Sequence, residues 1–303
     1  MKIIVTGANG FLGQHLIKLL LGKDYTVIAC SRGASRLSFA GSAQYRYYSV
    51  DITDRMALHE IMSREKPAIV IHTAAMTRVD DCELEQETSY GVNTLGTSHI
   101  LDCAQQYSNH FIHISTDFVF DGEKGNYSED DALGSVNWYG FTKIEAEQIV
   151  KQGKIPWAIV RTCLVYGNAL YGTRNNIISW VKEKLEKNER IKVVDDQLRT
   201  PTYIQDLAKG VVQVVEKKAC GIFHISGKNI LTPCAMAIRT ADFFSLDKSL
   251  IERTDASNFI EPAKRPLKTG FVIDKARKEL GYEPLSFEEG LEKMFGTRNA
   301  ERL

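Results

Sequence analysis

The first two thirds of the chain alternates short apolar runs with longer stretches in which apolar positions recur every three to four residues. The short runs are apolar at most positions, which is typical of strands covered on both faces. They are Ile3–Thr6, Thr26–Cys30, Tyr45–Val50, Ala68–Thr73, His110–Ser115 and Trp157–Arg161. The helical stretches between them include Leu12–Leu21, Arg55–Glu65, Glu85–Tyr107 and Tyr139–Lys151. This alternation predicts an α/β fold with a doubly wound parallel sheet and right-handed crossovers.

The pattern changes after Arg161. Helices are expected over Asn175–Lys187 and Gln205–Lys217, a short apolar run covers Ile191–Val194, and a strand is expected over Gly221–Ser226. The tail from Thr232 carries four of the seven prolines and two or three helices. We therefore expect a nucleotide-binding core and a smaller C-terminal lobe. The expected core is residues 1–165 with about 203–228, and the expected lobe is 166–202 with 229–303.

Composition narrows the function classes. The 303 residues contain 38 Lys plus Arg and 38 Asp plus Glu, so the formal net charge is zero. That balance argues against nucleic acid or an anionic membrane as the main partner. The N-terminus runs directly into a strand pattern and does not read as a signal peptide. The six cysteines form no Cys-x-x-Cys pair and the seven histidines are scattered, so we expect reduced cytoplasmic thiols and no metal site.

A glycine-rich turn joins the first predicted strand to the first predicted helix. It reads Gly7-Ala8-Asn9-Gly10-Phe11-Leu12-Gly13. Gly7 permits a sharp turn, Gly10 permits close approach of a pyrophosphate, and Gly13 permits close helix packing. The free amides at the helix start and the helix dipole then favour phosphate. A purely structural turn is the alternative, but the flanking strand and helix favour a dinucleotide held by Gly7, Asn9, Gly10, Phe11, Leu12 and Gly13.

The end of the second strand should choose the cofactor. An acidic residue there would favour NAD, but this chain has Ser31 and Arg32, with Arg36 one helical turn further on. Guanidinium groups and a hydroxyl suit a 2′-phosphate, so we expect NADP(H) to be preferred, with NAD(H) left open. The alternative for Arg32 is a solvated surface charge. Asp51 and Ile52 follow the third strand and are expected beside the adenine, unless Asp51 caps the next helix.

Two clusters carry candidate chemistry. Tyr139 and Lys143 are four residues apart, so a helix presents them on one face. A phenol has a pKa of about 10 and is a slow acid at neutral pH, but a neighbouring ammonium favours the phenolate. Tyr139 could then give a proton to a carbonyl oxygen while Lys143 holds a ribose hydroxyl. Thr116 and Asp117 end the fifth strand, at the sheet edge where ligands bind, and could bond the substrate oxygen and a substrate hydroxyl.

These motifs resemble a known family. In this order and spacing, Gly7-x-x-Gly10-x-x-Gly13, Ser115-Thr116-Asp117 and Tyr139-x-x-x-Lys143 are similar to the extended short-chain dehydrogenases/reductases. The runs His113–Gly122 and Asp195–Thr202, with Arg265-Pro266, resemble the dTDP-4-dehydrorhamnose reductases. The resemblance implies a Rossmann-type core, a nucleotide-sugar pocket built partly by the lobe, and the catalytic residues Thr116, Tyr139 and Lys143. It also implies cofactor contacts from Ala74, Ala75, Thr77, Asn93, Ser115 and Leu164.

Two departures bear on the sugar. Members of that family tend to carry an aromatic residue shortly after the sixth strand, where this chain has Leu164. The segment Ser31–Ala43 is also longer and richer in arginine than the resemblance predicts. Arg199, Thr202 and Arg265 are candidates for the substrate's diphosphate, because guanidinium forks suit phosphate oxygens. The alternative for each is ordinary surface or interface charge.

The hypothesis is NADPH-dependent reduction of a 4-keto nucleotide sugar, as in dTDP-L-rhamnose biosynthesis. One alternative is an NAD-dependent epimerase of the same superfamily. Dehydratases place two acidic residues after the threonine, whereas Asp117 is followed by Phe118. A second alternative is a non-catalytic NADP-binding regulatory subunit resembling that of methionine adenosyltransferase. Whether the protein forms a homodimer stays open.

Overall fold

A seven-stranded parallel sheet forms the centre of the computed structural model, which describes residues 1–39, 41–172 and 176–296. Its strand order is β10-β6-β5-β4-β1-β2-β3. The strands are β1 (Lys2–Thr6), β2 (Thr26–Ser31), β3 (Tyr45–Ser49), β4 (Ile69–His72), β5 (His110–Thr116), β6 (Trp157–Thr162) and β10 (Gly221–His224). The expected α/β class and doubly wound sheet are confirmed. Strand order reverses between β1 and β4, and a ligand cleft forms beyond the carboxyl ends at such a point.

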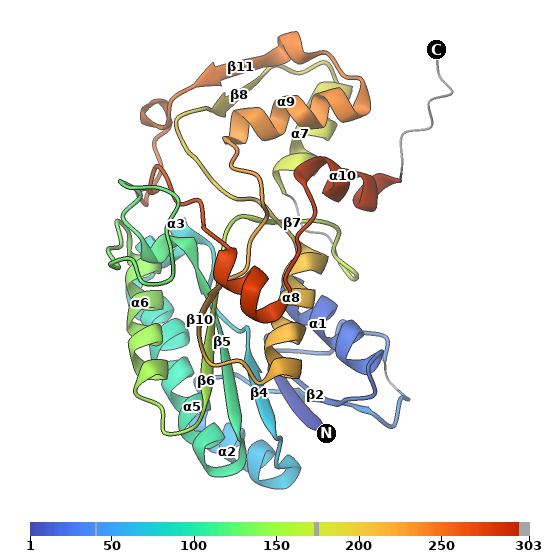
Figure 1. Cartoon of the computed structure of the whole chain (residues 1–303), viewed down its shortest axis with the longest axis vertical. Helices are drawn as coiled ribbons and strands as arrows, with labels where there is room; N and C mark the ends of the chain where they lie inside the picture. The colour runs from blue at the N-terminus through green and yellow to red at the C-terminus, as the bar shows by residue number, and fades with distance from the viewer. Residues whose placement is uncertain (40, 173–175, 297–303) are drawn as a thin grey trace.

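Helices cover both faces of the sheet (Figure 1). On one face lie α1 (Phe11–Leu21) and α8 (Ile204–Lys217), and on the other lie α2 (Arg55–Glu65), α5 (Gly96–Tyr107) and α6 (Trp138–Lys151). Strand β1 is buried on both sides, because Ile3 and Val5 belong to the core under α1 and α8, whereas Ile4 belongs to the opposite core. Such two-sided burial explains why the strand runs are apolar at almost every position.

The helical stretch expected over Glu85–Tyr107 is present from Gln86 onward, but it is not α-helical throughout. It consists of α4 (Gln86–Tyr90), a wide π turn (Gly91–Leu95) and α5, and a short α3 (Val79–Leu84) precedes it. The π turn puts Asn93 inside the protein, where its amide bonds the backbone of Met76. Such turns commonly mark functional sites, and apolar periodicity does not reveal them.

A smaller layer lies beyond one end of the sheet, at the top of Figure 1. It contains α7 (Ile177–Glu186), α9 (Pro233–Phe244), α10 (Phe287–Phe295) and the parallel pair β8 (Ile191–Val194) and β11 (Ile251–Thr254). Asn176 caps α7, so the helix expected from Asn175 begins two residues later; Asn175 itself lies outside the described residues. Two-residue strands β7 (Val165–Tyr166) and β9 (Thr202–Tyr203) pair near the cleft. Single turns complete the layout: Asp117–Val119, Lys248–Leu250, Ala256–Asn258 and Ala276–Leu280.

The described part of the chain contains no helix with the length and apolar character needed to cross a lipid bilayer. The six cysteines are unpaired, and Cys220 is the exposed one. Within the same residues, no group of three His, Cys, Asp or Glu side chains is arranged to hold a metal ion.

Candidate active site

The glycine turn is pressed against the end of β4. Gly7 has a φ of +69°, and a Cβ there would lie 2.7 Å from Thr73 Oγ1. A Cβ on Gly13 would lie 2.3 Å from the Gly7 oxygen, so only glycine allows α1 to start this close to the turn. No side chain caps the helix at Gly10. The turn and the helix start therefore fit the pyrophosphate of a dinucleotide, as expected from the sequence.

Asn9 fixes the loop after β2. Its Nδ2 donates to the backbone oxygens of Arg32 (3.3 Å) and Ala34 (3.0 Å), and its Oδ1 accepts from the Arg36 amide (2.9 Å). These hydrogen bonds from Asn9 fix the backbone of the loop that is predicted to bind the cofactor. The Arg32 side chain stays 77% exposed and reaches within 3.8 Å of Asp51 Oδ2.

A cavity of about 450 Å³ opens beside this loop. Its walls include Ser31, Arg32, Asp51 and Ile52, which were predicted for the adenosine end. They also include Gly7 and Gly10 of the glycine turn, and Ala74 and Ala75. The capping alternative for Asp51 does not apply, because Asp54 caps α2 by accepting from the Ala57 amide. Asp51 Oδ1 accepts from the Thr53 amide at 2.9 Å, and the residue lines the cavity.

A second cavity of about 490 Å³ continues from the first. The two share Gly10, Thr73 and Ala75 in their walls. The second cavity is also lined by Phe11, Leu12, Thr77, Ser115, Thr116, Asp117, Tyr139, Lys143, Leu164, Arg199 and Arg265. Together they form one trough along the carboxyl ends of the strands, of the shape that a dinucleotide and a second ligand require.

Tyr139 and Thr116 meet at this trough because α6 starts directly on the end of β5. A Cβ on Gly140 would lie 2.1 Å from the Phe118 oxygen, so no larger residue fits at this contact. Asn137 caps the helix by accepting from the Gly140 amide at 2.9 Å. The Tyr139 ring packs edge-on against Phe118, with centroids 6.0 Å apart, and the Thr116 hydroxyl donates to Asp117 Oδ1 at 3.1 Å.

Lys143 is buried one turn further along α6. Its Nζ donates to the Ile114 oxygen (2.8 Å) and lies 3.0 Å from Nε2 of His113. Burial lowers the pKa of Lys143 to about 8. The ammonium is therefore held at the wall of the trough, and no carboxylate among the described residues contacts it directly.

Ser115 does not turn its hydroxyl to the trough. Its Oγ donates to Glu147 Oε1 at 2.6 Å. Glu147 also forms a two-point ion pair with Arg161, at 2.9 and 2.7 Å, and both side chains are at most 1% exposed. This buried group joins β5, β6 and α6 behind the helix turn that carries Lys143.

Asp117 is enclosed by protein groups. Its Oδ2 accepts from the Thr269 hydroxyl and from the Cys163 thiol (3.3 Å), and Arg199 Nε lies 3.9 Å away. Burial raises the pKa of Asp117, although Arg199 and Thr269 act in the opposite direction. The predicted bond to a substrate hydroxyl would have to compete with these partners.

Arg199 and Thr202 are also engaged within the protein. The Arg199 guanidinium donates to the backbone oxygens of Pro266 (2.7 Å) and Leu267 (2.9 Å). Thr202 is fully buried and donates to the Cys163 oxygen at 2.6 Å. Arg199 thus holds the segment after Arg265, and Thr202 ties β9 to the end of β6, so neither presents free donors to a diphosphate.

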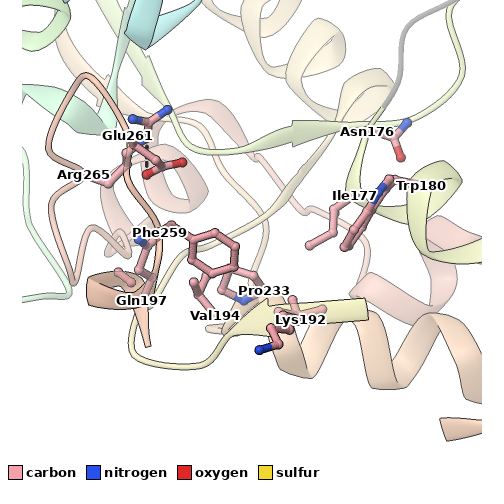
Figure 2. Close-up of a pocket in the computed structure, with 12 residues that line it drawn as sticks. Asn176, Ile177, Trp180, Lys192, Val194, Gln197, Pro233, Phe259, Glu261 and Arg265 are labelled. Carbon is pink, nitrogen blue, oxygen red and sulfur yellow. Dashed lines mark ion pairs between the residues drawn. The ribbon is translucent and has the colours of Figure 1, made fainter. Parts of the chain in front are cut away.

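Arg265 stands where the trough meets a pocket of the smaller layer. It forms a two-point ion pair with Asp80, at 2.6 and 2.8 Å, and these hydrogen bonds hold the pKa of Asp80 below its usual value. The neighbouring pocket, about 480 Å³, shares Arg265 and Gln197 with the trough. Figure 2 shows its Trp180 and Phe259 rings on different walls, and the Arg265–Glu261 ion pair at its edge.

Asn93 and Leu164, both predicted as cofactor contacts, occupy different places in the structure. Asn93 is buried, and its amide bonds Met76 and the Thr142 hydroxyl (3.0 Å), so it braces the loop after β4 against α6. Leu164 lines the trough with a φ of +38°, a conformation that is strained for a branched residue.

Sequence reasoning missed several residues of this region. Asp80 follows the β4 loop directly, and its position after a strand end was an available signal. Trp180 and Phe259 gave no such signal, because they are far apart in sequence and line the same pocket only in the folded chain. His113 was noted only as part of a motif, yet it contacts Lys143.

The fold and these side chains put the protein among the extended short-chain dehydrogenases/reductases. More narrowly, the chain belongs to the RmlD substrate binding domain family, whose model matches residues 1–299.

Three similar proteins illustrate the membership. The chain is 30% identical to a dTDP-4-dehydrorhamnose reductase of Aggregatibacter actinomycetemcomitans, over 96% of this chain and 97% of that one. It is similar to the solved structure of dTDP-4-dehydrorhamnose reductase from Bacillus anthracis in complex with NADP, with a TM-score of 0.84, 28% identity and coverage of 97% and 98%. It is also 27% identical to methionine adenosyltransferase 2 subunit beta of Rattus norvegicus, over 88% and 78% of the two chains.

Proposed function

We propose that the protein reduces a 4-keto nucleotide sugar to the alcohol with NADPH, as a dTDP-4-dehydrorhamnose reductase does in dTDP-L-rhamnose biosynthesis. One observation carries the proposal. The trough runs from Arg32 past the glycine turn to Tyr139, and then continues through Arg265 into the pocket of Trp180. That path suits a dinucleotide and a nucleotide sugar whose reacting ends meet beside Tyr139.

The chain's own residues divide the chemistry. NADPH, when bound, supplies the hydride that the keto carbon accepts. The Tyr139 hydroxyl donates a proton to the keto oxygen. The Thr116 hydroxyl, which donates to Asp117 in the structure, turns to the same oxygen and strengthens its polarisation. Lys143 keeps a positive charge near the phenolate that remains, and one of its hydrogens holds a ribose hydroxyl.

The substrate side of the proposal rests on Arg265. Its guanidinium lines both the trough and the lobe pocket, and a diphosphate placed there would compete with Asp80 for its donors. The base would then lie near Trp180 and Phe259. Asp117 and Arg199 shape this passage by holding the segment after Arg265, and Thr202 supports it through its bond to Cys163.

The cofactor preference is tested at Arg32. We expect Arg32→Ala to raise the KM for NADPH about 5- to 10-fold and to leave the KM for NADH unchanged, because the guanidinium is exposed and serves only the 2′-phosphate. Steady-state kinetics with both cofactors measures this. Arg239→Ala, at an exposed arginine paired with Glu288, is the matched control. An unchanged NADPH KM would refute the role of Arg32.

The proposal also includes the division of the chain into two domains and its oligomeric state. Residues 1–165 with about 203–228 would hold the cofactor, and 166–202 with 229–303 would hold the sugar. Support comes from β10, which joins the main sheet, and from β8 and β11, which pair apart from it; residues 173–175 and 297–303 of this division lie outside the described residues. A cytoplasmic homodimer is the proposed assembly, and light scattering of the purified protein tests it.

The decisive experiment incubates the protein with NADPH and a panel of 4-keto nucleotide sugars. Stoichiometric loss of NADPH absorbance, with a product two mass units heavier than the substrate, supports the reductase. Product without net NADPH consumption would indicate the epimerase alternative. No turnover of any sugar, together with a stoichiometric synthetase partner in a pull-down, would indicate the regulatory-subunit alternative, to which the similarity with methionine adenosyltransferase 2 subunit beta gives weight.

A further inference from the structure

The ammonium of Lys143 has protein partners on one side and the trough on the other. An ammonium carries three N–H donors and no acceptor. Two described partners lie behind it: the Ile114 oxygen at 2.8 Å and His113 Nε2 at 3.0 Å. Lys143 also lines the trough, so its third hydrogen is the one left for a ligand. The direction of that hydrogen is set by the other two contacts.

The contact with Lys143 fixes the protonation of His113. Because an ammonium can only donate, Nε2 of His113 must be the accepting nitrogen, and the ring proton lies on Nδ1. His113 is fully buried, and no partner for its Nδ1 exists among the described residues. Burial and the neighbouring ammonium lower the pKa of His113 well below its ordinary value, so the ring stays neutral.

This arrangement is a poor choice for packing alone. A buried N–H without a partner is unfavourable, and an aliphatic side chain would avoid it. The neighbouring strand positions Ile112 and Ile114 are aliphatic. What the histidine adds at this position is the acceptor that faces Lys143.

We propose that His113 is a positioning residue that holds the Lys143 ammonium through Nε2 and so aims its third N–H at the ribose of the bound nicotinamide nucleotide. The inference rests on the proposed function for the identity of that ribose. His113 touches neither cofactor nor substrate and acts only through Lys143.

The groups around Lys143 show why the His113 contact is important for keeping the lysine protonated. Glu147 and Tyr139 face it from α6, His113 from β5 and His72 from β4, and Asp117, in the turn after β5, lines the same trough. Glu147 favours the ammonium, but its carboxylate is engaged by Arg161 and Ser115. Loss of the His113 acceptor therefore leaves the ammonium less stabilised, and Lys143 loses its proton at a lower pH.

The test compares three variants without any sugar present. His113→Leu removes the acceptor, His113→Gln returns an acceptor oxygen near Nε2, and His110→Leu changes another buried histidine at the opposite end of β5. NADPH dissociation constants are measured by fluorescence between about pH 6 and pH 10, the range in which a lysine of lowered pKa titrates. Thermal midpoints and wild-type histidine ¹⁵N spectra are recorded in parallel.

We expect His113→Leu to weaken NADPH binding about 10- to 100-fold, the scale of one lost hydrogen bond to a charged group. Its affinity should fall at lower pH than in the wild type, while its thermal midpoint stays equal or rises. His113→Gln should restore most of the affinity, and His110→Leu should bind as the wild type does. The spectra should show a neutral ring protonated on Nδ1.

Equal NADPH affinity and pH dependence in His113→Leu and the wild type would overturn the inference, as would a proton on Nε2. A loss in His113→Leu that His113→Gln does not restore would also contradict it, because only the acceptor is claimed. Failure of the proposed function is a separate result. It would appear as wild-type protein that binds NADPH normally and reduces no 4-keto sugar.

Discussion

Tyr139→Phe should lower kcat by about 10²-fold or more while NADPH still binds, because a single hydroxyl is the proton donor in the proposed reaction. The ring itself stays in place, since its edge-on packing against Phe118 does not need the hydroxyl. Single-turnover measurements with NADPH and the accepted 4-keto sugar separate this loss from any change in binding.

The control variant makes the same Tyr-to-Phe change outside the candidate active site. Tyr107→Phe removes a hydroxyl that contacts His59 on the surface of α5, and its turnover should match the wild type. Near-wild-type turnover in Tyr139→Phe would end the proposal that this phenol is the acid. Loss of NADPH binding in the same variant would instead mean that the phenol is needed to hold the cofactor.

Arg161→Leu should destabilise the protein by about 3–5 kcal/mol, because it leaves the Glu147 carboxylate buried without its main partner. The two side chains are at most 1% exposed, so solvent cannot screen the remaining charge. Urea unfolding followed by circular dichroism gives the change as a lower midpoint with an unchanged slope. Turnover should fall as well, since Glu147 lies one turn beyond Lys143 on α6.

The double variant Arg161→Leu with Glu147→Met identifies the cause. It removes both charges and should recover most of the lost stability, as replacement of buried ion pairs by apolar residues generally does. Lys182→Ala breaks an exposed pair with Glu186 and should cost at most about 1 kcal/mol. If the double variant were as unstable as Arg161→Leu, loss of packing rather than an unpaired carboxylate would explain the effect.

The sheet could be predicted from the sequence because its strands are buried on both faces and therefore carry continuous apolar runs. The π turn that contains Asn93 could not be predicted, since such a turn leaves the apolar periodicity of the helix almost intact. Strand β11 (Ile251–Thr254) was also missed, because its exposed residues Glu252 and Arg253 break the apolar run.

Some residues of the candidate site could likewise be predicted from the sequence, and others could not. The glycine turn and the Tyr139–Lys143 pair are local patterns, so their spacing alone indicates that they lie together. The partners of Arg199 lie 67 and 68 residues away in sequence, at Pro266 and Leu267, and only the folded chain brings them together. From the sequence, Arg199 is therefore a candidate for a phosphate or an ordinary surface or interface charge, whereas in the structure it donates to backbone oxygens and to Gln197.

The enclosure of Asp117 has a consequence during protein synthesis. Strand β5 leaves the ribosome long before Thr269, whose hydroxyl bonds the Asp117 carboxylate in the finished molecule. Until that distant segment emerges, the Asp117 carboxylate lacks the Thr269 hydroxyl, and Arg199 lacks the Pro266 and Leu267 oxygens to which it donates. The wall of the trough around Asp117 and Arg199 is therefore complete only when translation is nearly finished.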